Sequence, residues 1–272
     1  MQDTDPVLFT SADDIATITL NRPAAMNAMT DGLMCGLSEA LAQVLDDDSI
    51  RVVVITGAGR GFCAGADLAQ VADPSLKEAA EGKASEVESD DTEDSFNTAM
   101  RALMDCPVPT IARVNGPAAG GGFGLALACD ITIAAESAFF IATFGPRLGI
   151  VPDMGATWSI PLRVGRARAL GITLLGDRIT ATQAQEWGMI WRAVTDDQLD
   201  NEVATVAAVL KRSSPSTVTR IRASIDAAIH NTFSDQLDLE MEHQGVLIPR
   251  NMQKGALAFM EKREPRFGGE RD

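Results

Sequence analysis

The sequence predicts an α/β protein whose short buried strands alternate with helices and are followed by an all-helical C-terminal region. Up to about residue 135, apolar runs of four to six residues are typical of strands, and an amphipathic stretch lies between the first two of them. From residue 166 onward the pattern is helical. With 272 residues and 46% hydrophobic residues, the chain can form one large domain, alone or with a small helical appendage.

The first strand is expected at residues 15–20, where apolar and polar side chains alternate. Thr30 or Asp31 can cap the helix that follows and runs to about Leu45. A buried strand at 52–55 completes a β-α-β order. The predicted helix places four apolar residues on one face, namely Leu33, Leu37, Leu41 and Val44.

Residues 71–95 are rich in Glu and Asp and poor in large apolar side chains, which is typical of a solvated loop. Further strands are expected at 110–114 and 130–135. Ser214 before Pro215 is a good N-cap for one of the later helices. Those helices are expected to start near Thr180 and to occupy 196–211, 214–228, 234–247 and 251–262.

Two glycine-rich segments, at 57–68 and 115–124, are the most informative features of the chain. Each follows a predicted strand and leads into a helix-compatible stretch. Glycine permits tight turns and close backbone approach, and a helix N-terminus leaves N–H groups free. Two such turns side by side can direct two N–H groups at one oxygen, as in an oxyanion hole. Neither segment has the lysine of a P-loop or the spacing of a dinucleotide-binding fingerprint.

Five motifs in order resemble those of the crotonase superfamily, the enoyl-CoA hydratase/isomerase family. The resemblance covers nearly the whole chain. Its motifs lie at residues 21–28, 62–68, 115–122, 148–155 and 258–267.

The resemblance implies a crotonase (ClpP/crotonase-like) spiral of ββα units with a C-terminal helical trimerisation region. Residues 1–200 would form the core with the acyl-CoA site. Residues 201–272 would form the oligomerisation region of a homotrimer or a dimer of trimers. In this family the stretch at 71–95 lies beside the acyl pocket, so it is either a lid that sets acyl-chain size or a surface insertion.

The resemblance assigns the oxyanion hole to the backbone N–H groups of Ala66 and Gly121. Chemistry at the α-carbon of a thioester passes through an enolate whose charge collects on the thioester oxygen. Loss of one such donor typically costs about 3 kcal/mol of transition-state stabilisation.

The proton-transfer groups depart from the hydratase pattern, because Gly124 and Gly145 stand where hydratases carry two glutamates. Hydration needs one group to activate water and another to protonate C2. Asp153 remains, at a position where some isomerases and dehalogenases of the family carry a functional aspartate. An apolar pocket of Met154, Phe144 and Trp158 would raise its pKa. The alternative is that Asp153 caps a helix beginning near Gly155.

Three functions follow from these residues. The first is isomerisation of an enoyl-CoA, Δ3 to Δ2 or related, with Asp153 as acid and base; similar family members isomerise ring-epoxidised phenylacetyl-CoA. The second is an enoyl-CoA hydratase of fatty-acid or aromatic-acid degradation that recruits other acids. The third is a non-catalytic acyl-CoA binder.

The same resemblance implies that CoA enters as the thioester substrate, with no tightly bound cofactor and no metal. Asp67 can instead cap the next helix, and Lys262 can be a solvated helix end. Phe259 and Lys262 would reach CoA from the last helix, across a subunit boundary. The implied CoA-binding residues are Ala24, Ala25, Met26, Ala28, Ala64, Asp67, Leu68, Gly120, Phe259 and Lys262.

The net charge of −15 argues against nucleic acids and anionic lipid surfaces as partners. The CoA phosphates would therefore need local Arg or Lys side chains. No signal peptide or membrane-spanning segment is visible, and a cytoplasmic location is expected. The four cysteines, which lack metal-ligand spacing, are expected to be free thiols: Cys35, Cys63, Cys106 and Cys129.

Overall fold

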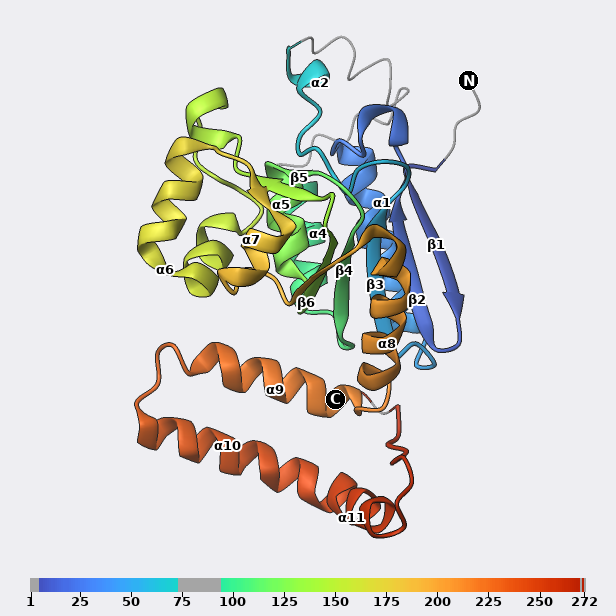
Figure 1. Cartoon of the computed structure of the whole chain (residues 1–272). Coiled ribbons are helices and arrows are strands. Elements are labelled where there is room, and N and C mark those ends of the chain that lie inside the picture. Colours follow the sequence, from blue (N-terminus) through green and yellow to red (C-terminus); the bar gives the residue numbers. More distant parts are fainter. Residues whose placement is uncertain (1–4, 73–93, 270, 272) are drawn as a thin grey trace.

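A six-stranded sheet runs through the body of the molecule in the order β1-β2-β3-β4-β6-β9 (Figure 1). The structure is a computed structural model, and it describes residues 5–72, 94–269 and 271. The first two strands are antiparallel and all later neighbours are parallel. The strands are β1 (Val7–Ala12), β2 (Ile15–Leu20), β3 (Val52–Gly57), β4 (Thr110–Val114), β6 (Ile131–Ala135) and β9 (Arg192–Val194).

Helices cover both faces of this sheet. α1 (Asp31–Asp46) packs against β1, β2 and α4 (Ser95–Met104), and α5 (Gly121–Ala128) packs against β4 and β6. α8 (Leu199–Leu210) lies across β4 and β6 from the other side (Figure 1). The apolar face predicted for α1 is buried, and the Thr30 hydroxyl caps the helix by accepting from the Leu33 N–H at 3.2 Å.

A smaller sheet, β5 (Ala118–Ala119), β7 (Phe139–Ile141) and β8 (Ile179–Thr180), adjoins the main one. Two short helical segments and one long helix lie between its strands or directly after them in the chain. These are a π-helical turn at Phe144–Leu148, α6 (Ala156–Leu175) and α7 (Ala181–Glu186), while α2 (Leu68–Ala72) follows the first glycine-rich segment.

The last three helices, α9 (Pro215–Ala227), α10 (Phe233–Leu247) and α11 (Gln253–Met260), form a separate layer beneath the body (Figure 1). Arg222 of α9 connects this layer to the sheet, since its Nε donates to Asp130 Oδ1 at 2.6 Å and its Nη2 to the Val108 carbonyl at 2.8 Å. No helix among the described residues is both long and apolar enough to cross a membrane.

The strands expected at 15–20, 52–55, 110–114 and 130–135 are confirmed, as are the caps at Thr30, Thr180 and Ser214. The helical region begins earlier than the predicted residue 166, because α6 already starts at Ala156. Its pattern is obscured by Pro161 and by Gly165, which has a non-helical φ of 77°.

Other elements differ from the sequence prediction in smaller ways. β1 is an exposed edge strand without clear alternation, and α4 follows directly on the acidic run, so neither was predicted. Residues 196–198 form a 3-10 turn before α8, and 248–252 form a π-helical turn before α11. Most of the predicted loop at 71–95 lies outside the described residues, and Ser95 already belongs to α4.

α5 lies directly under the turn that contains Met154. A Cβ at Gly124 would lie 2.6 Å from the Met154 carbonyl oxygen and 2.7 Å from the Met154 Cβ. Real Cβ atoms do not approach backbone this closely, so the helix and the turn can pack together only because residue 124 has no side chain.

We expect Gly124→Ala to lower the free energy of unfolding by about 1–3 kcal/mol, because the added methyl group displaces the Met154 turn. The matched control is Gly171→Ala in α6, where an added Cβ meets no heavy atom within 4 Å. That control should leave stability unchanged or raise it by about 0.5–1 kcal/mol. Chemical denaturation at fixed protein concentration measures both, and equal effects would show that residue 124 has room for a side chain.

Candidate active site

Two asparagine amides hold the glycine-rich segments in place. Asn27 is completely buried, and its Nδ2 donates to the carbonyls of Ala58 and Gly61, each at 2.9 Å. Asn115 Nδ2 donates to the Gly59 carbonyl at 2.9 Å, and its Oδ1 accepts from the Gly57 N–H at 3.2 Å. The first motif, the first glycine-rich segment and the start of the second are thereby linked through side-chain amides.

The two glycine-rich segments touch through their backbones at Gly65. This residue has a φ of +85°, in the left-handed region. A Cβ there would lie 2.8 Å from the Ala119 carbonyl oxygen and 3.2 Å from the Gly121 nitrogen. Only glycine allows both the conformation and the approach, so Gly65 places the residue after it next to the start of α5.

The backbone N–H groups of Ala66 and Gly121 are left without a protein acceptor among the described residues. Met29 instead pairs with the residues on either side of Ala66. Its carbonyl accepts from the Asp67 N–H at 2.9 Å, and its N–H donates to the Gly65 carbonyl at 2.8 Å. Gly121 is the first residue of α5, where N–H groups are free and the helix dipole is positive. Two adjacent donors of this kind can hold an anionic oxygen.

Asp153 lies beside this pair of donors. Its Oδ1 is 3.7 Å from the position that a Cβ on Gly121 would occupy, and Met154 Cγ is 3.0 Å from the same position. The turn that carries Asp153 is tight, with left-handed φ values of 51° at Met154 and 70° at Gly155. A non-glycine residue in this conformation is uncommon, and such residues cluster at functional sites.

The pKa of Asp153 is raised above its usual value. Burial of the carboxyl group is the largest cause, and the negative charge of Asp94 adds to it, while a backbone hydrogen bond acts in the opposite direction. Asp153 does not cap α6 through its side chain: the N-cap is Gly155, and no side-chain oxygen caps the helix. The alternative role as a helix cap is therefore wrong.

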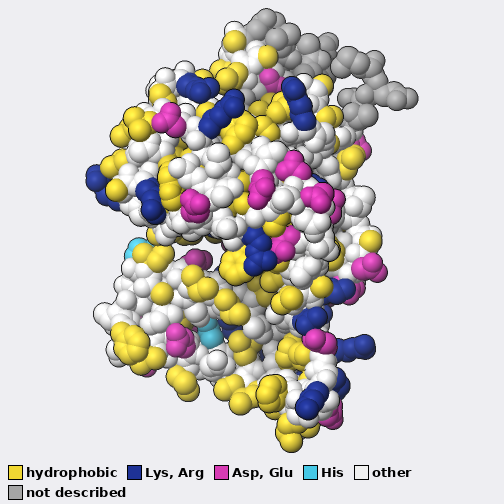
Figure 2. Space-filling view, viewed as in Figure 1, with side chains coloured by type: hydrophobic (Ala, Val, Ile, Leu, Met, Phe, Trp, Pro, Cys, Tyr) yellow, Lys and Arg dark blue, Asp and Glu magenta, His cyan; other side chains and the backbone are white. Residues whose placement is uncertain are grey.

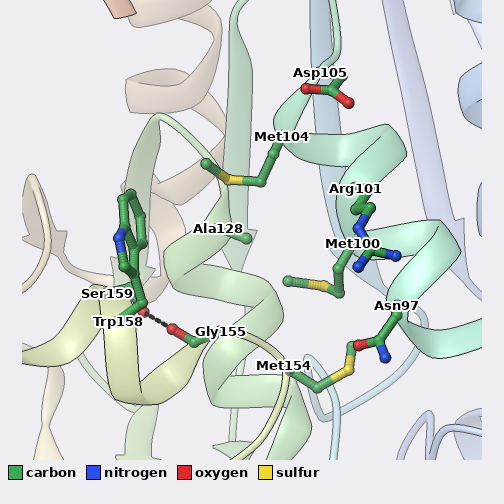
Figure 3. Close-up of a pocket in the computed structure, with 10 residues that line it drawn as sticks. All are labelled: Asn97, Met100, Arg101, Met104, Asp105, Ala128, Met154, Gly155, Trp158 and Ser159. Carbon is green, nitrogen blue, oxygen red and sulfur yellow. Dashed lines mark hydrogen bonds between the residues drawn. The ribbon is translucent and has the colours of Figure 1, made fainter. Parts of the chain in front are cut away.

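Two of the three residues predicted to form an apolar pocket around Asp153 line a common cavity, but Asp153 itself does not line it. Met154 and Trp158 line a cavity of about 680 Å³ between α4, α5 and α6 (Figure 3). Phe144 does not line it, because its side chain is buried in the π-helical turn. The opposite wall comes from α4, which the sequence analysis missed. The signal was present as apolar residues at i, i+3, i+4 and i+7, namely Phe96, Ala99, Met100 and Leu103.

The residues predicted to bind CoA fall into two groups. Ala24 and Ala25 lie in a 3-10 turn, and the Met26 carbonyl accepts from the Ala64 N–H at 3.0 Å, so the first motif adjoins the segment from Ala64 to Leu68. Ala28 is buried in the same turn, and Gly120 is the N-cap of α5.

The second group consists of Asp67, Phe259 and Lys262. The Asp67 carboxylate accepts from Arg22 Nη2 at 2.8 Å, so it forms an ion pair. Phe259 and Lys262 belong to α11 and the turn after it, at the opposite end of the molecule from α2 and β5 (Figure 1). Within one chain they are not brought to the other site residues.

The structure gives no carboxylate at position 124 or 145, where the resemblance places the two hydratase glutamates. Gly124 has no room for a side chain, and Gly145 is exposed in the π-helical turn. Cys63 lies against Gly122 of α5, but its thiol is buried and donates to the Asn27 carbonyl at 3.1 Å. Burial raises the pKa of Cys63 to about 12, so it is not a nucleophile at neutral pH.

Comparisons with known proteins identify the family. The family model for enoyl-CoA hydratase/isomerase matches residues 10–270. The chain is 42% identical over 257 residues to the 1,2-epoxyphenylacetyl-CoA isomerase of Escherichia coli K12, covering 94% of this chain and 95% of that protein. It is 37% identical over 264 residues to a probable enoyl-CoA hydratase of Rhodobacter capsulatus, covering 97% and 98%.

Solved structures show the same fold. The enoyl-CoA hydratase of Bacillus anthracis superposes with a TM-score of 0.84 at 32% identity, covering 97% of this chain and all of that one. An enoyl-CoA hydratase of Polaromonas also gives a TM-score of 0.84, at 30% identity over 96% of this chain and 99% of that one. The chain therefore belongs to the enoyl-CoA hydratase/isomerase family and has the crotonase fold that its motifs predicted.

Proposed function

We propose that the protein is an acyl-CoA isomerase in which Asp153 moves a proton at the α-carbon of the thioester. The observation that carries this proposal is the position of the Asp153 carboxylate, 3.7 Å from the Cβ position of Gly121 and beside two free backbone donors. The 1,2-epoxyphenylacetyl-CoA isomerase that is 42% identical supports isomerisation over hydration.

In this proposal the thioester oxygen accepts from the N–H groups of Ala66 and Gly121. For a 3-enoyl-CoA, Asp153 takes a proton from C2, and the charge spreads from the thioester oxygen to C4 as a dienolate. The carboxyl group then returns the proton at C4, which gives the 2-enoyl-CoA. One base with a raised pKa is enough, and water takes no part.

Hydration is less well supported by this site. It needs a second acid or base to act on water, and Gly124 and Gly145 supply none. The close contact between Gly124 and Met154 also fills the space that a glutamate at position 124 would need.

We place the CoA moiety along the first motif and the first glycine-rich segment, where Met26 and Ala64 are hydrogen-bonded neighbours. CoA acts here as part of the substrate, with no tightly bound cofactor. The proposed contacts on this side are Ala24, Ala25, Met26, Ala28, Ala64, Asp67, Leu68 and Gly120.

We further propose that residues 201–272 are the oligomerisation region of a homotrimer or a dimer of trimers. The C-terminal layer exposes large apolar side chains in the isolated chain (Figure 2), among them Phe233 at 81% and Phe259 at 85%. Such a surface is typical of a subunit interface. Association would also bring Phe259 and Lys262 of one subunit to the CoA site of another.

The oligomer proposal predicts a mass of three or six times the chain mass of 28.8 kDa in sedimentation equilibrium. Replacing two exposed apolar residues of the layer by charges, as in Ile225→Glu with Met241→Glu, should shift the protein toward monomer, because burying an unpaired charge is costly. The control Leu8→Glu on the edge strand β1 should keep the mass unchanged. A monomeric wild-type protein would overturn the proposal.

Asp153→Asn should lower kcat for a 3-enoyl-CoA by about 10²–10⁴-fold, because the amide cannot accept the C2 proton. Formation of the conjugated 2-enoyl thioester, followed by absorbance, measures this. The matched control is Asp177→Asn, an exposed aspartate after α6, which should retain full activity. Equal rates for Asp153→Asn and wild type would exclude Asp153 as the base.

Assays with related thioesters distinguish the isomerase from the hydratase and from the non-catalytic acyl-CoA binder. Water added to a 2-enoyl-CoA would support the hydratase. Tight acyl-CoA binding in calorimetry without turnover of a 3-enoyl or an epoxyphenylacetyl thioester would support the non-catalytic binder.

Asp153 must be deprotonated to act as a base, so kcat/KM should fall as the pH falls through its pKa. Because that pKa is raised, the decline should occur above the range of an ordinary aspartate, about pH 3.9. Asp94→Asn removes a nearby negative charge and should move the midpoint to lower pH. Asparagine can still cap α4, where Asp94 accepts from the Phe96 N–H at 3.2 Å.

The control for this pH profile is again Asp177→Asn, whose midpoint should equal that of the wild type. A midpoint that does not move in Asp94→Asn would show that the charge of Asp94 does not act on the catalytic group.

A further inference from the structure

Arg22 connects the first motif to the first glycine-rich segment through its guanidinium group. Its Nη1 donates to the Ala28 carbonyl, and its Nη2 donates to Asp67 Oδ2 at 2.8 Å. The side chains of this ion pair are only 25% exposed at Arg22 and 13% exposed at Asp67. An ion pair sheltered from water is costly to break, whereas an exposed pair contributes little. The guanidinium group therefore acts as a firm bridge between the two segments.

The backbone of Arg22 is itself fixed to a buried residue. Its N–H donates to Asn27 Oδ1 at 2.9 Å, and its carbonyl accepts from the Asn27 N–H at 2.9 Å. Asn27 is completely buried. Because the terminal nitrogens of Arg22 are both engaged inside the protein, these contacts give it a role in holding the fold of the site rather than in binding a CoA phosphate.

The bridge lies next to one of the two proposed backbone donors. The peptide between Gly65 and Ala66 is planar and trans, so its C=O and its N–H point in opposite directions. The Gly65 carbonyl accepts from the Met29 N–H at 2.8 Å. The Ala66 N–H is therefore directed away from Met29, and its direction depends on how residues 28–29 lie against residues 65–67.

Arg22 fixes these two short segments to each other. Ala28 directly precedes Met29 in the chain, and Asp67 directly follows Ala66. The backbone pairing at Met29 and the guanidinium bridge thus act on neighbouring residues of both segments. Without the bridge, the segments would be held at this point by the backbone pairing alone.

We propose that Arg22 is a positioning residue: by bridging Ala28 to Asp67 it fixes the direction in which the Ala66 N–H donates to the thioester oxygen. The inference rests on the proposed function, which assigns that oxygen to Ala66 and Gly121. Arg22 acts through the backbone and makes no contact with the substrate. A displacement of about 1 Å in a group that positions or stabilises the reacting atoms can cost about 10²-fold in rate.

The first test compares a thioester with a ligand that lacks its oxygen. Octanoyl-CoA carries the carbonyl group, and S-octyl-CoA has a methylene group in its place. Calorimetry on the full-length protein gives the ratio of their Kd values. Arg22→Met should shift this ratio against the thioester by about two- to tenfold, the range for one neutral hydrogen bond. An unchanged ratio would overturn the proposal, and so would equal weakening of both ligands, which indicates a contact with CoA itself.

The matched control is Arg192→Met, which breaks another sheltered ion pair. Arg192 Nη1 donates to Glu202 Oε1 at 2.5 Å, and the Glu202 side chain is 17% exposed, close to the value for Asp67. This pair joins β9 to α8, neither of which carries a proposed active-site residue. The control should keep the wild-type ratio. A shift as large as that of Arg22→Met would overturn a specific role for Arg22.

Arg22→Lys tests whether the bridge or the charge is needed, and it serves as the test if Arg22→Met fails to fold. Lysine keeps the positive charge, but its single ammonium group does not reproduce the planar fork of donors. We expect its ratio to shift as in Arg22→Met. A wild-type ratio in Arg22→Lys would show that a charge alone is enough, which would overturn the bridging role.

Turnover separates this inference from the proposed base. Arg22→Met should lower kcat for a 3-enoyl-CoA by about 10- to 100-fold with a smaller change in KM, because the donor acts mainly on charge that develops in the transition state. A wild-type kcat would overturn the positioning role. Asp153→Asn should keep the wild-type ratio of Kd values, since the base is not needed for binding. Full activity of Asp153→Asn with a shifted ratio in Arg22→Met would overturn the base and support the role of Arg22.

Discussion

The contact between the two glycine-rich segments is the constraint on which the rest of the site depends. Gly65 lies so close to Ala119 and Gly121 that no side chain fits between them, and the amides of Asn27 and Asn115 hold the surrounding loops. Backbone donors placed by such packing are rigid, and they need no reorganisation when charge develops on a bound oxygen. The side chains at these positions can be small because the proposed contacts to the thioester oxygen are made by the backbone.

The lack of a glutamate at position 124 and the location of Asp153 result from the same packing between α5 and the Met154 turn. Since Gly124 has no side chain, the Met154 turn packs directly on α5, and the left-handed backbone of Met154 and Gly155 presents Asp153 to Gly121. A glutamate at position 124 would occupy the space that this turn fills. The two observations, which look independent in the sequence, are linked by packing, and together they favour proton transfer by one carboxylate.

The cavity between α4 and α6 is built by other elements than the proposed reacting groups. Those groups are backbone N–H donors and the Asp153 turn, whereas the wall from Asn97 to Met104 belongs to α4, which contributes no proposed catalytic group. Large apolar side chains of α9–α11 are exposed at the far end of the molecule, where we propose that subunits meet.

The sequence by itself determined the fold family, the glycine positions and the lack of both hydratase glutamates, because motifs and residue identity are local properties. It also placed the strands at 52–55 and 110–114 and the caps at Thr30 and Ser214, where periodicity and capping chemistry act over a few residues. Only the tertiary structure decided that Asp153 does not cap α6 and lies beside Gly121, that Gly124 packs under Met154, and that α4 forms a wall of the cavity. These are contacts between segments far apart in the chain, and no local pattern specifies which side chains such segments bring together.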